Sequence, residues 1–183
     1  MNDVIVIQFT TLDGVVEDPD GSGGTTGGGW AFRHGPEAVA GDKFRLGTLL
    51  DTGVLLLGRG TWELFSKLWP TRTDDFSTRM NKAAKRVASR TLTDVGAWEN
   101  SALLSGDLLD EVRRLREERD VVVIGSTSIV HTLAGHGLVD EYRLLVFPLV
   151  LGSGRTWFTG PGDLHPVSVE QSGAAALLRY RTS

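Results

Sequence analysis

The chain of 183 residues contains no cysteine. It therefore forms no disulfide bond and has no thiol nucleophile, and the redox state of its compartment is left unconstrained. It also lacks any apolar run near the roughly 20 residues that a membrane-spanning helix needs. Its first residues, MNDVIVIQFTTLDG, lack the basic region and long apolar stretch of a secretory signal. We therefore expect a soluble cytoplasmic protein with no membrane partner.

The chain also has little excess of charge of either sign. The sequence has 19 basic and 23 acidic residues, for a formal net charge of −4. No stretch concentrates Lys and Arg with aromatic residues, which argues against a nucleic-acid partner. The four histidines show no metal-ligand spacing, so we expect no metal site. No G-x-G-x-x-G motif joins a first strand to its helix, which disfavours a conventional Rossmann domain.

What the chain does contain is an alternation of short apolar runs with segments of helical periodicity. This pattern predicts one α/β domain over residues 1–183, with helices on both faces of a mostly parallel sheet. After residue 142 the helices stop, so the stretches EYRLLVFPLVLGSG and AAALLRYRT predict an antiparallel end to the sheet. The predicted strands are 4–9, 54–57, 86–89, 102–104, 121–124 and 142–146, and the predicted helices are 37–50, 61–68, 76–84, 106–118 and 128–136.

The one low-complexity stretch, DPDGSGGTTGGGW at residues 18–30, has two interpretations. It is either a flexible loop without a role or a mobile flap beside a site. In the second case Trp30, the large aromatic residue that ends it, lies near the ligand.

Three predicted strands end in small hydroxyl residues, glycine or arginine. Gly58, Arg59 and Thr61 follow one strand, Ser89 and Arg90 follow another, and Gly125, Ser126, Thr127 and Ser128 follow a third. Hydroxyl side chains at such positions cap helices, but the amides of a first helical turn also bind phosphate. Ligands of open α/β sheets bind at the carboxyl ends of the strands, and arginine suits phosphate. The pattern indicates an anion site in addition to capping.

Five collinear motifs resemble the reductase domain of riboflavin biosynthesis, the RibD C-terminal domain, which belongs to the dihydrofolate reductase-like superfamily. They are TTLDG at 10–14, GRGTWE at 58–63, ASRTL at 88–92, IGSTSIVHTL at 124–133 and GLVDEYRLLVFPLVLGSGRTWF at 137–158. The resemblance implies a three-layer α/β/α fold, a mixed sheet with antiparallel C-terminal strands, and a homodimer. The zinc-deaminase half of the bifunctional riboflavin enzyme is missing, since no H-x-E…C-x-x-C pattern occurs.

The resemblance also implies that NADPH lies across the carboxyl ends of the central strands. Arg59, Ser89 and Arg90 then face the 2′-phosphate of the adenosine. Thr61 and the turn 125–128 hold the pyrophosphate, and Gly58 also matches the cofactor motifs.

The expected function is NADPH-dependent hydride transfer to a pterin-like, pyrimidine-like or carbonyl compound. The alternative is a non-catalytic nucleotide-binding or regulatory module that retains the fold. A proton donor is expected at Asp13, or second at Asp42, although the first equally fits a turn and the second a solvated helix charge. Substrate contacts are expected from Thr11, Trp30 and Trp62, of which Trp62 equally fits a core residue.

Overall fold

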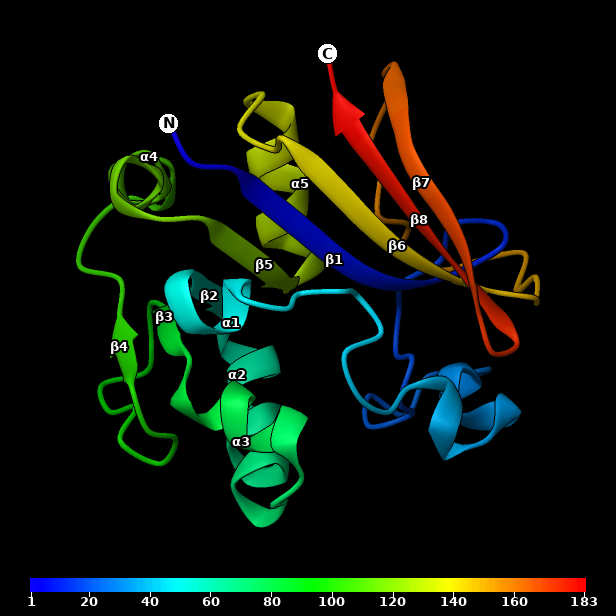
Figure 1. Ribbon diagram of the computed structural model, residues 1–183, viewed down its shortest axis with the longest axis horizontal. Coiled ribbons are helices and arrows are strands. Elements are labelled where there is room, and N and C mark those ends of the chain that lie inside the picture. The colour runs from blue at the N-terminus through cyan, green and yellow to red at the C-terminus, as the bar shows by residue number, and fades with distance from the viewer.

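The computed structural model describes residues 1–183, and its centre is one eight-stranded sheet (Figure 1). The strand order is β4-β3-β2-β5-β1-β6-β8-β7. The strands from β4 to β6 run parallel, whereas β8 is antiparallel to both β6 and β7. The expected mixed sheet is confirmed. Its strands are β1 (Val4–Thr11), β2 (Val54–Gly58), β3 (Ala84–Ala88), β4 (Ser101–Leu103), β5 (Val121–Gly125), β6 (Glu141–Phe147), β7 (Leu164–Ser172) and β8 (Ala175–Thr182).

Helices cover both faces of the sheet, as the sequence predicts (Figure 1). The α-helices are α1 (Leu49–Thr52), α2 (Arg59–Leu68), α3 (Asp75–Lys82), α4 (Leu108–Glu118) and α5 (Thr127–Gly135). Helices α4 and α5 pack on one face, against Val6, Leu56 and Val123. Helices α1, α2 and α3 pack on the other face, against Ile7 and Leu55. The neighbouring strands β2 and β5 have only apolar residues and glycine because both of their faces are covered.

The predicted helix 37–50 is wrong. The chain there forms the 3₁₀ helix η2 (Pro36–Ala38), an irregular stretch and then only the single turn α1. Gly41, Arg45 and Gly47 adopt positive φ angles of 72°, 54° and 51°. A residue in this conformation cannot continue a right-handed helix. The carboxylate of Asp42 accepts the amide protons of Leu46 (2.7 Å) and Gly47 (2.8 Å), which folds the segment into a turn.

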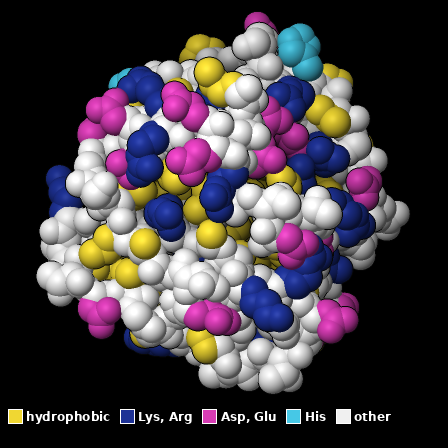
Figure 2. Space-filling model, turned by 60° about the vertical axis from the view of Figure 1, so that its left-hand side comes forward, with side chains coloured by type: hydrophobic (Ala, Val, Ile, Leu, Met, Phe, Trp, Pro, Cys, Tyr) yellow, Lys and Arg dark blue, Asp and Glu magenta, His cyan; other side chains and the backbone are white.

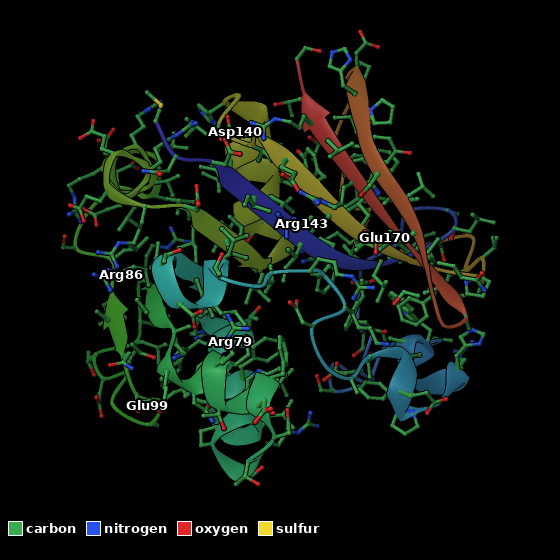
Figure 3. All side chains as sticks on the ribbon, in the orientation of Figure 1. Arg79, Arg86, Glu99, Asp140, Arg143 and Glu170 are labelled. Atoms are coloured by element: carbon green, nitrogen blue, oxygen red, sulfur yellow. The ribbon has the colours of Figure 1, made fainter.

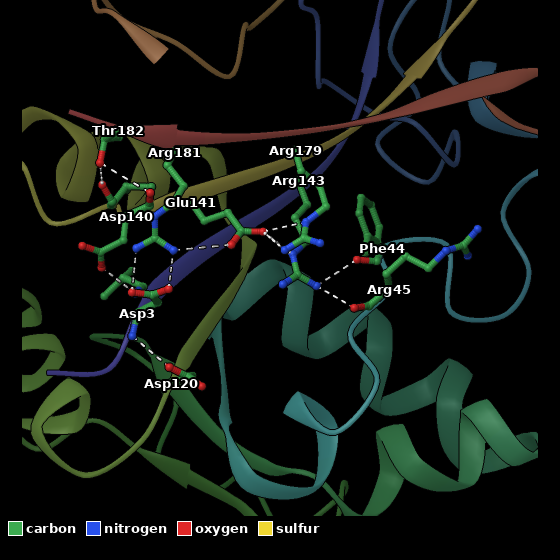
Figure 4. A network of polar contacts seen from close by, with 12 residues as sticks. Asp3, Phe44, Arg45, Asp120, Asp140, Glu141, Arg143, Arg179, Arg181 and Thr182 are labelled. Atoms are coloured by element: carbon green, nitrogen blue, oxygen red, sulfur yellow. Dashed lines mark hydrogen bonds and ion pairs between the residues drawn. The ribbon is translucent and has the colours of Figure 1, made fainter. Parts of the chain in front are cut away.

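A buried arginine holds this turn onto the sheet (Figures 3 and 4). Arg143 of β6 donates from Nη1 to the carbonyl oxygens of Phe44 (3.1 Å) and Arg45 (2.6 Å). Its Nε donates to Glu141 (2.7 Å), which also accepts from Arg179 of β8 (2.9 Å). Glu141 and Arg143 are both almost inaccessible to solvent. Their pairing compensates the cost of burying each charge, so removing one partner alone is strongly destabilising.

Near this network the two ends of the chain lie close together. Arg181 near the C-terminus pairs with Asp3 near the N-terminus at 2.7 Å.

None of the helices has the length and apolar character of a membrane span. The face in Figure 2 carries acidic and basic side chains interspersed rather than one large patch of a single sign.

The glycine-rich segment is organised around one carboxylate. Asp18 accepts the amide protons of Gly23 (2.7 Å) and Thr25 (2.9 Å) and the hydroxyl proton of Thr25 (2.9 Å). Its carbonyl oxygen also accepts the amide protons of Gly21 and Gly29. The hydrogen bond from Gly23, followed by that from Thr25, lowers the pKa of the Asp18 carboxyl below its ordinary 3.8. The loop therefore has an internal framework.

We expect Asp18→Asn to raise hydrogen exchange throughout residues 18–29, because a neutral amide accepts these hydrogen bonds more weakly. In the wild type the stabilisation is present above pH 3.8. The stabilisation is lost as the pH falls through the lowered pKa of Asp18 in the folded state. Below that pH, we expect faster hydrogen exchange in residues 18–29, once the rates are corrected for the intrinsic pH dependence of exchange.

Asp20→Asn is the matched control, because Asp20 bonds only to Ser22. Equal exchange in both variants and the wild type would show that Asp18 does not organise the loop.

Candidate functional site

A cleft of about 870 Å³ lies at the carboxyl ends of β3, β2 and β5. The loop after β4 and the first turns of α2, α4 and α5 complete its wall. Six of its residues are predicted cofactor contacts: Gly58, Arg59, Ser89, Arg90, Ser126 and Ser128. Parallel strands bring their carboxyl ends to one edge of the sheet, which is why residues distant in sequence meet here.

Two helices point their N-termini into this cleft. Gly58 is the N-cap of α2 and Ser126 is the N-cap of α5, and neither makes a side-chain capping hydrogen bond. The hydroxyl of Ser126 instead bonds that of Ser128 at 2.7 Å. The first amides of a helix have no partners within it, and the helix dipole adds partial positive charge there. Both turns are therefore suited to bind an anion.

The two turns contact each other through their backbones. A Cβ atom on Gly58 would lie 2.8 Å from Ser126 Oγ and 3.0 Å from its amide nitrogen. Gly125 has a φ of 145°, and the peptide bond from Gly125 to Ser126 is cis. A Cβ atom on Gly125 would lie 3.1 Å from Thr61 Oγ1. Glycine is needed at both positions for this approach.

Two arginines give the cleft its positive charge. Arg59 Nη1 donates to Thr91 Oγ1 at 3.2 Å, and Arg90 is exposed. Neither forms an ion pair with a carboxylate of this chain. Ser89 accepts the amide protons of Thr91 and Leu92, which shapes the turn that carries Arg90. Unpaired guanidinium groups beside a hydroxyl provide the donors that a phosphate requires.

The other three predicted cofactor residues lie outside the lining of the cleft. Thr61 and Gly125 contact each other where the two turns meet, and Thr127 is the first residue of α5. Their observed contribution is to the shape of the two turns.

Asp13 holds two loops together. It accepts the hydroxyl proton of Thr11 (2.6 Å) and the amide protons of Gly152 (2.7 Å) and Leu151 (3.3 Å). The bond from Thr11, and then that from Gly152, lowers the pKa of the Asp13 carboxyl. A general acid at neutral pH needs the opposite shift. This geometry favours a positioning role for Asp13, with Thr11 buried beneath it.

Three other predicted site residues, Asp42, Trp30 and Trp62, make contacts that stabilise the fold and do not line the cleft. Asp42 is not on a helix, because its carboxylate closes the turn at Leu46 and Gly47. Trp30 is fully buried against Phe147, with its indole donating to the carbonyl of Glu17, so it offers no surface to a ligand. Trp62 is buried in the core beneath α2, and its indole donates to Ser101.

Beside the cleft, an apolar wall covers the ends of β1 and β5. The rings of Phe9 and Phe44 stack at 5.2 Å, and Phe147 meets Phe9 edge-on at 5.8 Å. Gln8 of β1 donates to the carbonyl oxygen of Ile124, the residue of β5 that precedes Gly125. This hydrogen bond links the ends of β1 and β5. Phe9, Phe44 and Ile124 all remain partly accessible to solvent. The wall places an apolar surface next to the turn that begins at Gly125.

The sequence model of the RibD C-terminal domain matches residues 2–178. The chain belongs to the RibD C-terminal domain family. It is 32% identical over 117 residues to the uncharacterized protein YyaP of Bacillus subtilis, an alignment that spans 60% of each chain. The curated relative is thus matched over less than two thirds of its length.

Solved structures confirm the dihydrofolate reductase-like fold of this RibD C-terminal domain. A putative riboflavin biosynthesis protein from Shewanella sp. PV-4 superposes with a TM-score of 0.74 at 21% identity, covering 100% of this chain and 99% of that one. RibD of Acinetobacter baumannii gives 0.62 at 15% identity, and the chain covers 58% of it. A deaminase/uracil reductase of Thermotoga maritima gives 0.60 at 18% identity, with 57% covered.

Sequence reasoning missed part of the cleft of this RibD C-terminal domain. The missed lining residues are Gly60, Ala88, Thr91, Leu104, Gly106, Asp107, Leu108, Ile129 and Thr132. One signal was available, since Asp107 lies at the N-terminal end of the predicted helix 106–118, where an N-cap residue is expected. The loop between β4 and α4 carries no apolar or glycine pattern that indicates a site.

We expect Gly58→Ala to lower the free energy of unfolding by about 1–3 kcal/mol, because the new methyl group overpacks the contact with Ser126. The displaced turn should also weaken nucleotide binding. Thermal denaturation and titration calorimetry measure the two effects.

Gly135→Ala in α5 is the control, because a Cβ atom there meets nothing within 4 Å. Equal free energies of unfolding for the two variants would contradict the need for glycine at position 58, because the turns at Gly58 and Ser126 could then move apart without loss of stability.

Proposed function

We propose that this protein is an NADPH-dependent reductase that transfers hydride to a small molecule. The observation that carries the proposal is the convergence of two uncapped helix N-termini and two unpaired arginines on one cleft. Membership in the RibD C-terminal domain family supports it.

The donors of the cleft match the anionic groups of NADPH. The first turns of α2 and α5 would hold the pyrophosphate, because the small residues Gly58 and Ser126 leave their amides open to the cleft. Arg59 and Arg90, with the Ser89 hydroxyl, would hold the 2′-phosphate. When bound, NADPH supplies the hydride, and the protein supplies orientation and electrostatics. A volume of about 870 Å³ is large enough for an extended dinucleotide.

The hydride acceptor that fits best is a flat, conjugated molecule with a C=N or C=O bond, such as a pterin-like or pyrimidine-like ring. The wall of Phe9, Phe44 and Ile124 supports this, since aromatic side chains stack on planar rings. Asp13 and Thr11 would position the loop 151–152 at the edge of this wall. A proton for the reduced product would then come from water or from the substrate.

We expect Arg59→Ala and Arg90→Ala each to weaken NADPH binding about tenfold, because each loses a charge-assisted contact with the 2′-phosphate. NADH lacks that phosphate, so its affinity should be almost unchanged. Titration calorimetry with both cofactors measures the ratio.

Arg113→Ala is the control, because Arg113 lies on α4, pairs with Asp110 and does not line the cleft. Equal losses for NADPH and NADH would contradict the assignment of these arginines to the 2′-phosphate.

The alternative is a non-catalytic nucleotide-binding module. The three hydrogen bonds that Asp13 accepts from Thr11, Leu151 and Gly152 favour it, since they hold the best sequence candidate for a proton donor as a carboxylate. Steady-state oxidation of NADPH over a panel of pterin, pyrimidine and carbonyl compounds separates the two functions. Tight NADPH binding without oxidation by any acceptor would favour the module.

We also propose that the protein forms a homodimer through β7. This strand ends the sheet and has no neighbour on its outer side, and its Val167 and Val169 are exposed by 48% and 65%. An unpaired edge with exposed apolar residues is a site for pairing with a second chain.

Val169→Lys is expected to shift the mass measured by light scattering from dimer to monomer. Val150→Lys is the control, because Val150 is equally exposed but lies outside β7. A monomeric wild type at micromolar concentration would contradict the dimer.

A further inference from the structure

Four of the residues that line the cleft are apolar, and together they form what we call its apolar slot. Ala88 at the end of β3, Leu104 after β4, Leu108 of α4 and Ile129 of α5 line this part. All four side chains pack at the edge of the core beneath α4 and α5. An apolar slot beside a phosphate site is suited to a planar base, because burial of its faces removes apolar surface from water.

One carboxylate stands at the rim of this slot. Asp107, the N-cap of α4, is the sole acidic residue that lines the cleft. Its Oδ1 accepts the amide protons of Leu109 (2.9 Å) and Asp110 (3.4 Å). Its Oδ2 has no hydrogen-bond partner in the chain, and Asp107 forms no ion pair. The capping role therefore uses only half of the carboxylate.

At the N-cap of α3, by contrast, both carboxylate oxygens accept hydrogen bonds. Asp74 accepts the amide proton of Ser77 with Oδ1 (3.0 Å) and the hydroxyl proton of Ser77 with Oδ2 (2.5 Å). Asp74 does not line the cleft. The two aspartates thus have the same structural role at their helices, but only Asp107 lines the cleft and keeps one carboxylate oxygen without a partner in the chain.

We propose that Asp107 determines the base specificity of the cleft, with Oδ2 accepting a proton from the exocyclic amine of adenine. This rests on the proposed binding of a dinucleotide but not on hydride transfer. A carboxylate accepts hydrogen bonds and donates none. A base with an oxygen in place of the amine would set its lone pairs against those of the carboxylate, and the hydrogen bond to Asp107 would be lost. The arginines thus select the phosphate, and Asp107 selects the base.

The test compares NADPH with its hypoxanthine analogue, in which an oxygen replaces the exocyclic amine of adenine. We expect the wild type to bind NADPH about tenfold more tightly than the analogue. Asp107→Asn should remove most of this preference, because the amide of asparagine donates to the oxygen of hypoxanthine. Asparagine caps helices as well as aspartate does, so α4 should remain folded. Circular dichroism and thermal denaturation check this.

Asp74→Asn is the matched control and should keep the tenfold preference. If Asp107→Asn also keeps it, Asp107 is a helix cap only and the proposal is overturned. A wild type that binds both dinucleotides equally overturns it as well. A protein that binds NADPH with the expected preference but oxidises it with no acceptor would leave the assignment of Asp107 intact and refute the reductase. A protein that binds neither dinucleotide refutes both.

Discussion

The backbone contact between the ends of β2 and β5 fixes the arrangement on which the cleft depends. These strands are neighbours in the sheet although α2, α3, β3, β4 and α4 separate them in sequence. Since Gly58 has no side chain, the turn at Ser126 can approach it closely. The N-termini of α2 and α5 therefore lie side by side at one cleft. A larger residue at position 58 would separate them.

The second constraint is the buried pair of Glu141 and Arg143. It carries little functional chemistry itself, but it fixes the carbonyl groups of Phe44 and Arg45 over the sheet. The ring of Phe44 consequently lies on Phe9, beside the end of β5. Buried ion pairs are more valuable for fixing one geometry than for net stability. Here the pair positions an irregular segment that has no helix to support it.

The sequence alone predicts most of the sheet and the two strand-to-helix turns that form one end of the cleft. Val121 to Ile124 form a strand because an apolar run buried on both faces has few other conformations available. Gly58 and Ser126 mark strand-to-helix turns because small residues are required there. Strand β7 was not predicted, because its exposed and partly polar residues carry no apolar run. An edge strand is specified by its neighbour β8 rather than by its own pattern.

Only the tertiary structure decided what the polar and aromatic candidates do. Asp42 resembles a catalytic acid by position, but Gly41 and Gly47 bend the chain around its carboxylate. Trp30 follows a glycine-rich loop, yet it is buried because Phe147 of β6 lies beneath it. Local sequence fixes the periodicity of strands and helices, since that depends on near neighbours along the chain. The partners of a side chain come from distant strands, so its role follows only from the packing of the whole sheet.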